Sequence, residues 1–277
     1  MLREEILALS KTQLEHPIII DEVHWLIENT QVTFVFCGSS SRRLKQGGSN
    51  LLGGRAIRYN FYPLIYPEYQ QEFDLLKIFN QGLIPSHFVS KDPRTLLQSY
   101  IEDYVTNEIR AEGYVRNITA FSRFLDSTRF SCSEMLNYTN VAWEVGIDAK
   151  TIKEYYQILV DTSYTKKISR NIISHTPKFY YFDVGLTTRL SKKSFTELVG
   201  ADAAKALENY VLMELIAYVG LNDSDYNLFY WRTNTEIEID FILSNTITKP
   251  IPIEVKISKN LHKTELRSIK SFMEELY

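Results

Sequence analysis

The chain of 277 residues has few of the residues that build disulfide or zinc frameworks. Its two cysteines, Cys37 and Cys132, lie far apart and outside any recognisable zinc motif, which argues against both. The five histidines show no metal-ligand spacing, so none is assigned a role. A reducing, cytoplasmic compartment fits this composition best.

Long apolar runs and an excess of one charge are also missing. The N-terminus has no apolar signal region, and no uncharged apolar run approaches the length of a membrane span. We therefore expect a soluble protein without membrane contact. The net charge is −3, so contact with nucleic acid would have to come from local basic patches. The hydrophobic share of 44% is ordinary for a globular chain with one large or two to three small domains.

The phosphate-binding motif G-x-x-x-x-G-K-[ST] is absent, although two other features typical of ATPases are present. Residues 17–22 form an apolar run that ends in two acids, as a Walker B strand does. In such a site Asp21 would hold magnesium through water and Glu22 would polarise the attacking water. A second apolar run, 32–37, leads to hydroxyl residues including Ser39, which would lie beside these acids if the strands are parallel neighbours. The alternative is a pair of parallel strands that merely end in polar loops.

A basic, glycine-rich segment follows these strands. No acidic residue occurs between Glu28 and Glu68. Such a segment favours phosphate groups of a nucleotide or a nucleic acid, and a solvated basic loop is the alternative. Its candidate phosphate-binding residues are Arg42, Arg43, Lys45, Arg55 and Arg58.

Two charged strands are predicted near the C-terminus. In residues 236–243 acids occupy even positions and apolar residues odd positions up to Phe241, and residues 251–257 repeat the alternation. Neighbouring strands would thus present Asp240, Glu254 and Lys256 on one surface. The two carboxylates suit magnesium, and the lysine can orient a water that attacks a phosphodiester. The alternative is a solvated sheet face.

A helix-turn-helix is predicted in the middle of the chain. Residues 131–146 and 147–159 would supply its two helices, with Gly146 in the turn and Asp148 as the cap of the second helix. Residues 166–170 and 178–183 would be the strands of a wing, and Asp183 would cap a following helix rather than act in catalysis. DNA recognition and simple packing between domains both remain open for this segment. The outward residues that would contact DNA are Lys150 and Lys153.

Several of these motifs resemble one family. The bacterial and archaeal AAA-type ATPases that carry the C-terminal domain of unknown function 4143 are similar to this chain over nearly its whole length, notably at 18–22, 37–44, 50–56 and 62–64. The resemblance implies that Asp21 and Glu22 are a Walker B pair, that Ser39 holds the sensor-1 position, and that Arg55 belongs to the ATPase remnant. It also implies a winged-helix-like segment followed by a nuclease-like domain.

The C-terminal part is similar to the PD-(D/E)XK nuclease superfamily. Its core has a helix with a glutamate, a strand that ends in aspartate, and a strand with Glu-x-Lys. Glu208 matches the helix glutamate, Asp240 the aspartate, and Glu254 and Lys256 the tripeptide. The resemblance implies catalytic roles for all four, with magnesium held by Asp240 and Glu254.

The expected fold is therefore α/β, with three parts. Residues 1–66 would be a partial AAA-type parallel sheet, residues 67–190 a helical linker and winged-helix-like segment, and residues 191–277 a truncated restriction-endonuclease-like domain. Relative to the family the chain lacks a P-loop, has a short segment after Walker B, and stops inside a helix. We expect a fragment or decayed copy of such an ATPase, which acts on or docks to DNA without hydrolysing ATP by itself. A non-catalytic interaction or DNA-binding module, with a protein partner or a second copy, is the alternative.

Overall fold

The computed structural model describes residues 18–19, 34–35, 59–105, 115, 117–128, 132–162, 165–170, 176–222, 224–258 and 266–276. The chain divides into two compact units. The first comprises Met1–Tyr59 with Asp161–Ser163, and the second comprises Asn60–Val160 with Tyr164–Tyr277. Each unit is considered by itself.

In the first unit the described residues form a two-stranded parallel sheet. Strand β1, Ile18–Ile19, pairs with β2, Phe34–Val35, in the register Ile18 to Phe34 and Ile19 to Val35. This is the parallel neighbourhood that the predicted Walker B and sensor-1 strands require.

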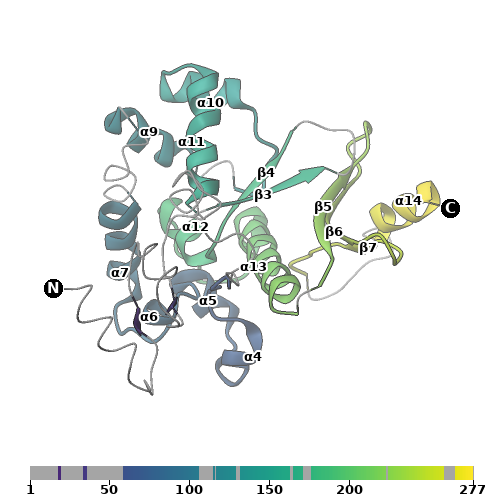
Figure 1. Ribbon diagram of the computed structural model, residues 1–277, viewed down its shortest axis with the longest axis horizontal. Coiled ribbons are helices and arrows are strands. Elements are labelled where there is room, and N and C mark those ends of the chain that lie inside the picture. Colours follow the sequence, from purple (N-terminus) through teal and green to yellow (C-terminus); the bar gives the residue numbers. More distant parts are fainter. Residues whose placement is uncertain are drawn as a thin grey trace. The chain divides into compact units, whose positions relative to one another are not determined.

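The second unit contains helices at both ends of a mixed sheet (Figure 1). Its helices are α4 (Tyr66–Tyr69), η1 (Gln70–Glu72), α5 (Leu75–Gln81), α6 (Pro85–Phe88), α7 (Pro93–Ser99), the π-helix η2 (Tyr100–Val105), α9 (Ile118–Thr128), α10 (Tyr138–Val145), α11 (Ala149–Asp161), α12 (Val184–Leu190), α13 (Gly200–Leu221) and α14 (Arg267–Leu276). Its strands are β3 (Thr165–Arg170), β4 (Lys178–Tyr181), β5 (Asn227–Arg232), β6 (Glu238–Ser244) and β7 (Ile251–Ile253).

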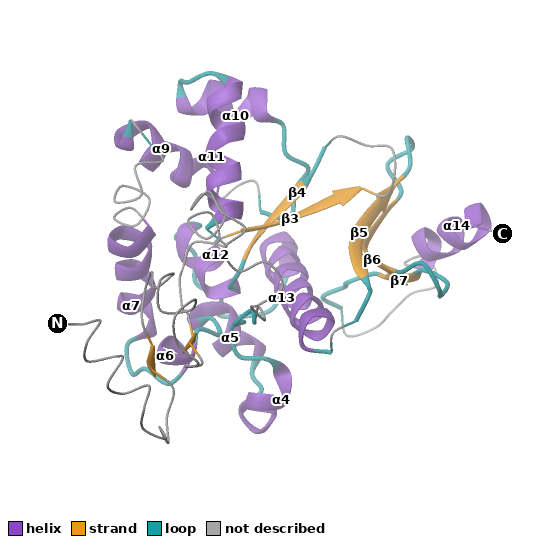
Figure 2. Cartoon of the chain, viewed as in Figure 1, coloured by secondary structure: helices purple, strands orange, loops and turns teal. Residues whose placement is uncertain are grey.

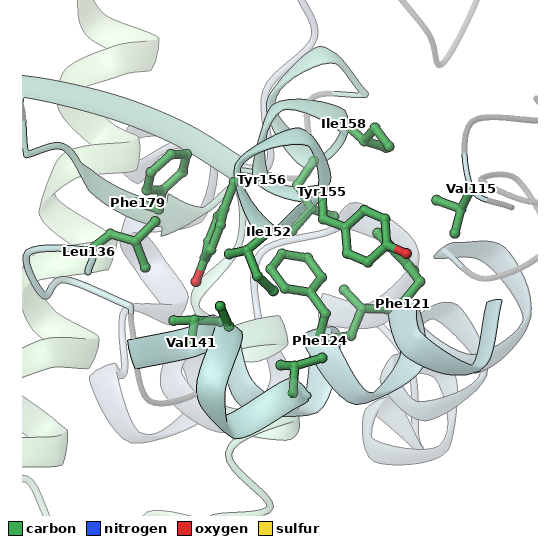
Figure 3. Close-up of a cluster of buried hydrophobic side chains, with 14 residues drawn as sticks. Val115, Phe121, Phe124, Leu136, Val141, Ile152, Tyr155, Tyr156, Ile158 and Phe179 are labelled. Atoms are coloured by element: carbon green, nitrogen blue, oxygen red, sulfur yellow. The ribbon is translucent and has the colours of Figure 1, made fainter. Parts of the chain in front are cut away.

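Helices α9, α10 and α11 enclose an aromatic core (Figure 3). Phe124 and Tyr156 meet edge to face with ring centroids 4.8 Å apart, and Phe179 of β4 lies 4.6 Å from Tyr156. The predicted turn is confirmed: Gly146 ends α10 in a left-handed conformation at φ 73°, which glycine adopts without steric cost. Asp148 accepts the backbone N–H of Thr151 at 2.9 Å and so caps α11.

One continuous sheet joins the middle of the chain to its C-terminal part (Figure 2). The strand order is β4-β3-β5-β6-β7, and β3 pairs with β5 in parallel while every other neighbouring pair is antiparallel. Ser169 and Arg170 of β3 lie opposite Phe229 and Tyr230 of β5. The sheet therefore crosses the boundary predicted between residues 190 and 191.

Helix α13 is buried on two sides (Figure 1). Ala206 and Tyr210 pack with α5, and Leu212 packs with Tyr180 and Phe241 of the sheet. Leu207, Val211 and Leu215 of the same helix are only half-buried. No helix among the described residues is long and apolar enough to cross a membrane.

A β-bulge changes the faces of β6. Phe229 pairs with Ile242, but Trp231 pairs with Ile239, so Asp240 and Phe241 together lie opposite Tyr230. Ile239 and Ile242 consequently pack with Phe272 of α14, whereas Phe241 packs towards α13. The strict alternation predicted for residues 236–243 is wrong for this reason, since the extra residue moves Phe241 to the other face from Ile239.

Asp183 has the capping role expected of it. Its carboxylate accepts the backbone N–H of Leu186 at 3.1 Å in the first turn of α12, and also that of Leu83 at 2.6 Å. Burial raises the pKa of Asp183 to about 6 although these donors act in the opposite direction. The side chain thus fixes the turn after α5 against the start of α12.

Candidate functional site

A cleft of ≈ 480 Å³ brings together most of the predicted catalytic residues. It is lined by the first half of α13, the adjoining ends of β4, β5 and β6, the segment after β7 and the segment before α10. Glu208, Asp240 and Lys256 line it together. Its other charged residues are Glu134, Lys178, Lys205, Arg232 and Glu238.

Asp240 is positioned by the end of β7. The backbone N–H of Val255 donates to Asp240 Oδ2 at 2.7 Å. The Asp240 carboxylate thus accepts the Val255 N–H, which a backbone carbonyl of the neighbouring strand would accept if β7 continued. Strand β7 therefore ends at Ile253. Glu254 and Lys256 therefore follow the strand instead of lying within it, which corrects the prediction of a strand through residue 257. Burial is the main reason that the pKa of Asp240 lies above its ordinary value.

Glu208 reaches the cleft from α13 and is held by two residues of β4. Tyr180 donates its hydroxyl to Glu208 Oε1 at 2.6 Å, and Lys178 Nζ lies 3.3 Å from the same oxygen. Burial raises the pKa of Glu208 to about 7, although the charge of Lys178 lowers it, and the charge of Asp240 raises it further. A negative charge at this position is therefore costly unless a cation remains close.

Lys178 was missed by sequence reasoning. Its side chain is only 4% exposed, and its ammonium forms ion pairs with both Glu208 and Glu238. Burial lowers the pKa of Lys178, but the charges of Glu208 and Glu238 outweigh this effect and raise the pKa above its ordinary value. The only available signal was a lysine at the start of the aromatic run 178–182, where a charge needs a buried partner.

Glu254 lies beside the cleft rather than in its lining. Its Oε1 accepts Lys256 Nζ at 2.5 Å, and its side chain is 11% exposed. Its Oε2 is buried and accepts no hydrogen bond of normal geometry among the described residues, although the nearby Ser268 side chain lowers the pKa of Glu254. Burial raises the pKa of Glu254, and the nearby charge of Asp240 adds to that shift.

The donor set suits a cation that needs few protein ligands. Magnesium prefers oxygen ligands, usually keeps several waters and is held by one or two carboxylates plus substrate phosphates. Asp240 and Glu254 supply two carboxylates, and the unpartnered Glu254 Oε2 is one candidate ligand atom. Within the described part of the chain, no three His, Cys, Asp or Glu side chains are grouped to hold a metal ion. The carboxylates of the cleft therefore form no three-carboxylate cation site among the described residues.

The remaining predicted residues are distributed as follows. Lys150 and Lys153 are exposed on α11, as a DNA-contacting role requires. The ATPase candidates and the basic segment lie outside the described residues, namely Asp21, Glu22, Ser39, Arg42, Arg43, Lys45, Arg55 and Arg58.

Comparison with known families matches two parts of the chain. Residues 74–197 match Domain of unknown function (DUF8612). Residues 203–277 match Domain of unknown function (DUF4143). The second match agrees with the resemblance inferred from the sequence, and neither match is an ATPase or nuclease family. No curated protein and no solved structure matches the chain.

The two matches divide the candidate site between them. Glu208, Asp240 and Lys256 lie in the DUF4143 region, whereas Lys178 and Tyr180 lie in the DUF8612 region. Both regions therefore supply side chains that hold the carboxylates of the cleft.

Proposed function

We propose that the DUF4143 region is a magnesium-dependent, nuclease-type module that acts on phosphodiesters of nucleic acid. One observation carries this proposal: Asp240 and Lys256 share a cleft with Glu208, and Glu254 is bound to Lys256 at its side. Glu208 lies on α13, Asp240 near the start of β6, and Glu254 and Lys256 after β7, an order that supports the resemblance to the PD-(D/E)XK pattern.

The chemical roles follow from the contacts. A magnesium ion, when bound, would offset the charge that develops on a phosphate during attack by water. Asp240 and Glu254 would hold that ion, since both are half-buried carboxylates with raised pKa values that a cation would relieve. Lys256 would bind a phosphate oxygen or orient water, because its ammonium is oriented by Glu254 and lines the cleft. Glu208 would stay bound to Lys178 and Tyr180 at the helix side of the cleft.

We also propose that residues 118–181 form a winged-helix-like module that docks on DNA. The order of α9, α10, α11, β3 and β4 supports it, as does a short pairing of Cys132 with Phe179 and of Met135 with Lys178. Lys150 and Lys153 would face the phosphates. The acidic Glu154 on the same helix reduces the positive charge of this surface. The module would therefore orient the protein on DNA more than it would strengthen DNA binding.

The N-terminal unit would be the remnant of an AAA-type ATPase. The parallel pair β1 and β2 supports a Walker B strand beside a sensor-1 strand. The sequence lacks G-x-x-x-x-G-K-[ST], the motif that holds the β- and γ-phosphates, so this chain would not hydrolyse ATP by itself.

A second candidate function is docking without cleavage. It is favoured by one observation: each carboxylate of the site already has a donor within the chain. Lys178 pairs with Glu208 and Glu238, Val255 donates to Asp240, and Lys256 donates to Glu254. A site that has lost its catalytic activity would keep the same network, because these contacts also stabilise the fold.

Cation binding by calorimetry tests the nuclease-type proposal. Magnesium or manganese is expected to bind the wild-type chain at neutral pH, and Asp240→Asn should weaken binding at least ~10-fold because a charged ligand becomes a neutral amide. Asp225→Asn is the matched control, since Asp225 is exposed before β5 and does not line the cleft. Equal binding by wild type and Asp240→Asn would contradict the proposal.

A further inference from the structure

The cleft holds more acidic groups than a magnesium site of this kind uses. Besides the exposed Glu134, which pairs with Lys205, three carboxylates line it, namely Glu208, Glu238 and Asp240, and Glu254 lies at its side. Four carboxylates without neighbouring cations would form a site for a larger ion such as calcium, which takes six to eight oxygen ligands. What distinguishes them is how each is already bound within the protein.

Glu208 and Glu238 share one buried cation. The ammonium of Lys178 pairs with Glu208 from α13 and with Glu238 from β6. Two further donors hold these acids: the Tyr180 hydroxyl binds Glu208 at 2.6 Å, and Arg232 Nη1 lies 2.9 Å from Glu238 Oε2. Glu208 therefore has one charged and one neutral donor within the fold, and Glu238 has two charged donors.

Asp240 and Glu254 are held differently. Asp240 has a backbone donor through one oxygen, and Glu254 has an unpartnered oxygen besides the one bound to Lys256. Lys178 forms no ion pair with either, although its charge lowers the pKa of Asp240. Glu254 pairs instead with Lys256, whose side chain is 38% exposed and can move to solvent when a metal ion binds. The acidic groups of the cleft are thus divided into a pair held by a buried lysine and a pair beside an exposed one.

We propose that Lys178 is a positioning residue that withdraws Glu208 and Glu238 from cation binding and so makes this a two-carboxylate, magnesium-type site. This inference rests on the proposed function for the identity of the cation pair. The site would then need a substrate phosphate to complete the coordination shell, which couples tight cation binding to the presence of nucleic acid.

The ammonium of Lys178 is well placed for this role. It is buried, and the Tyr230 ring centroid lies 5.5 Å from Nζ, so the stem is packed and the charge is confined near its two acids. A divalent cation that drew Glu208 or Glu238 to itself would leave Lys178 buried without its partners, which is strongly unfavourable. The energetic cost of that exchange keeps the two acids out of the metal shell.

The decisive variant is Lys178→Met, examined by calorimetry with calcium and with magnesium separately. Loss of the ammonium releases Glu208 and Glu238, and calcium affinity should rise at least ~10-fold because calcium accepts more carboxylate ligands than magnesium. Lys205→Met is the matched control: Lys205 lines the same cleft but pairs with the exposed Glu134, so its loss should change calcium affinity less than ~3-fold. Calcium affinity of Lys178→Met within threefold of wild type would overturn the proposal.

A second variant covers the case in which Lys178→Met fails to fold. Glu208→Gln keeps an oxygen that can accept the Tyr180 hydroxyl, and it should leave magnesium affinity within ~3-fold of wild type because Glu208 is not a cation ligand. A loss of ~10-fold or more would identify Glu208 as a ligand and end the proposal.

The two proposals fail in different ways. If Asp240→Asn binds magnesium as well as wild type, the nuclease-type site is wrong, and Lys178→Met still decides the role of Lys178 through its gain or lack of calcium binding. If Asp240→Asn loses magnesium but Lys178→Met gains no calcium affinity, the site stands and the role of Lys178 is wrong.

Discussion

Cleavage of DNA in the presence of magnesium is expected to fall by ~10²–10³-fold when Lys256 is replaced by alanine, the loss typical for removal of one fixed donor to a developing charge. The ammonium lines the cleft and is held by Glu254 at 2.5 Å, so it would be oriented before substrate arrives. Alanine removes this positive charge and also leaves Glu254 without its donor. Initial rates on a labelled duplex and on a single strand would measure the effect.

The control for this change is Lys270→Ala. Lys270 is exposed on α14 and does not line the cleft, so its loss should leave the rate within about twofold of wild type, as for surface substitutions away from special contacts. Equal cleavage by Lys256→Ala and wild type would rule out the assigned role of Lys256. Absence of cleavage by wild type, together with magnesium binding that Asp240→Asn abolishes, would favour docking without cleavage.

Replacing Gly185 with alanine is expected to lower the free energy of unfolding by ~3 kcal/mol or more, the upper end of the usual cost of overpacking. A Cβ atom at Gly185 would lie 2.4 Å from the backbone N and 2.5 Å from Cα of Gly82, and backbone atoms cannot move aside as a flexible side chain can. Alanine would favour the helix itself by about 0.5–1 kcal/mol, so the clash has to exceed that gain. Thermal unfolding should show a midpoint lowered by ~6–12 °C.

Gly146→Ala separates steric clash from backbone strain. Gly146 also has no side chain, but a Cβ there would meet nothing within 4 Å, and only its φ of 73° disfavours alanine. Its cost should be about 1–2 kcal/mol, the penalty for a left-handed residue with a side chain. If Gly185→Ala and Gly146→Ala unfold with the same free energy, the predicted clash is wrong, because α5 and α12 would then have moved apart without loss of stability.

The turn between α10 and α11 could be predicted because its signals are local, although α10 begins at Tyr138 and not at residue 131. Gly146 and Asp148 act through backbone groups within four residues of themselves, and Ile152, Tyr155 and Leu159 of α11 recur at helical spacing. The same is true of Asp183 at the start of α12. Predictions that depend on a residue and its immediate neighbours were confirmed for this reason.

The faces of β6 could not be predicted from alternation. The bulge at Asp240 and Phe241 depends on how β6 pairs with β5, which lies in a different segment of the chain. The ion pairs of Lys178 are likewise invisible in the sequence, since Glu208 is 30 residues away and on another element. Sequence reasoning therefore found Glu208 and Asp240 in the cleft, and it missed Glu238 and the lysine that pairs with both Glu208 and Glu238.

The parallel pairing of β3 with β5 has a mechanical consequence. Ile168 of β3 lies opposite Lys178, and the next residue, Ser169, lies opposite Phe229 of β5. A hinge rotation of the β3–β4 hairpin against the rest of the sheet would have to break these backbone hydrogen bonds, and it would shift the ammonium of Lys178 away from Glu208 and Glu238. A displacement of the hairpin is therefore coupled to the carboxylates through the hydrogen-bonded sheet. Domains joined by a flexible linker would lack this coupling.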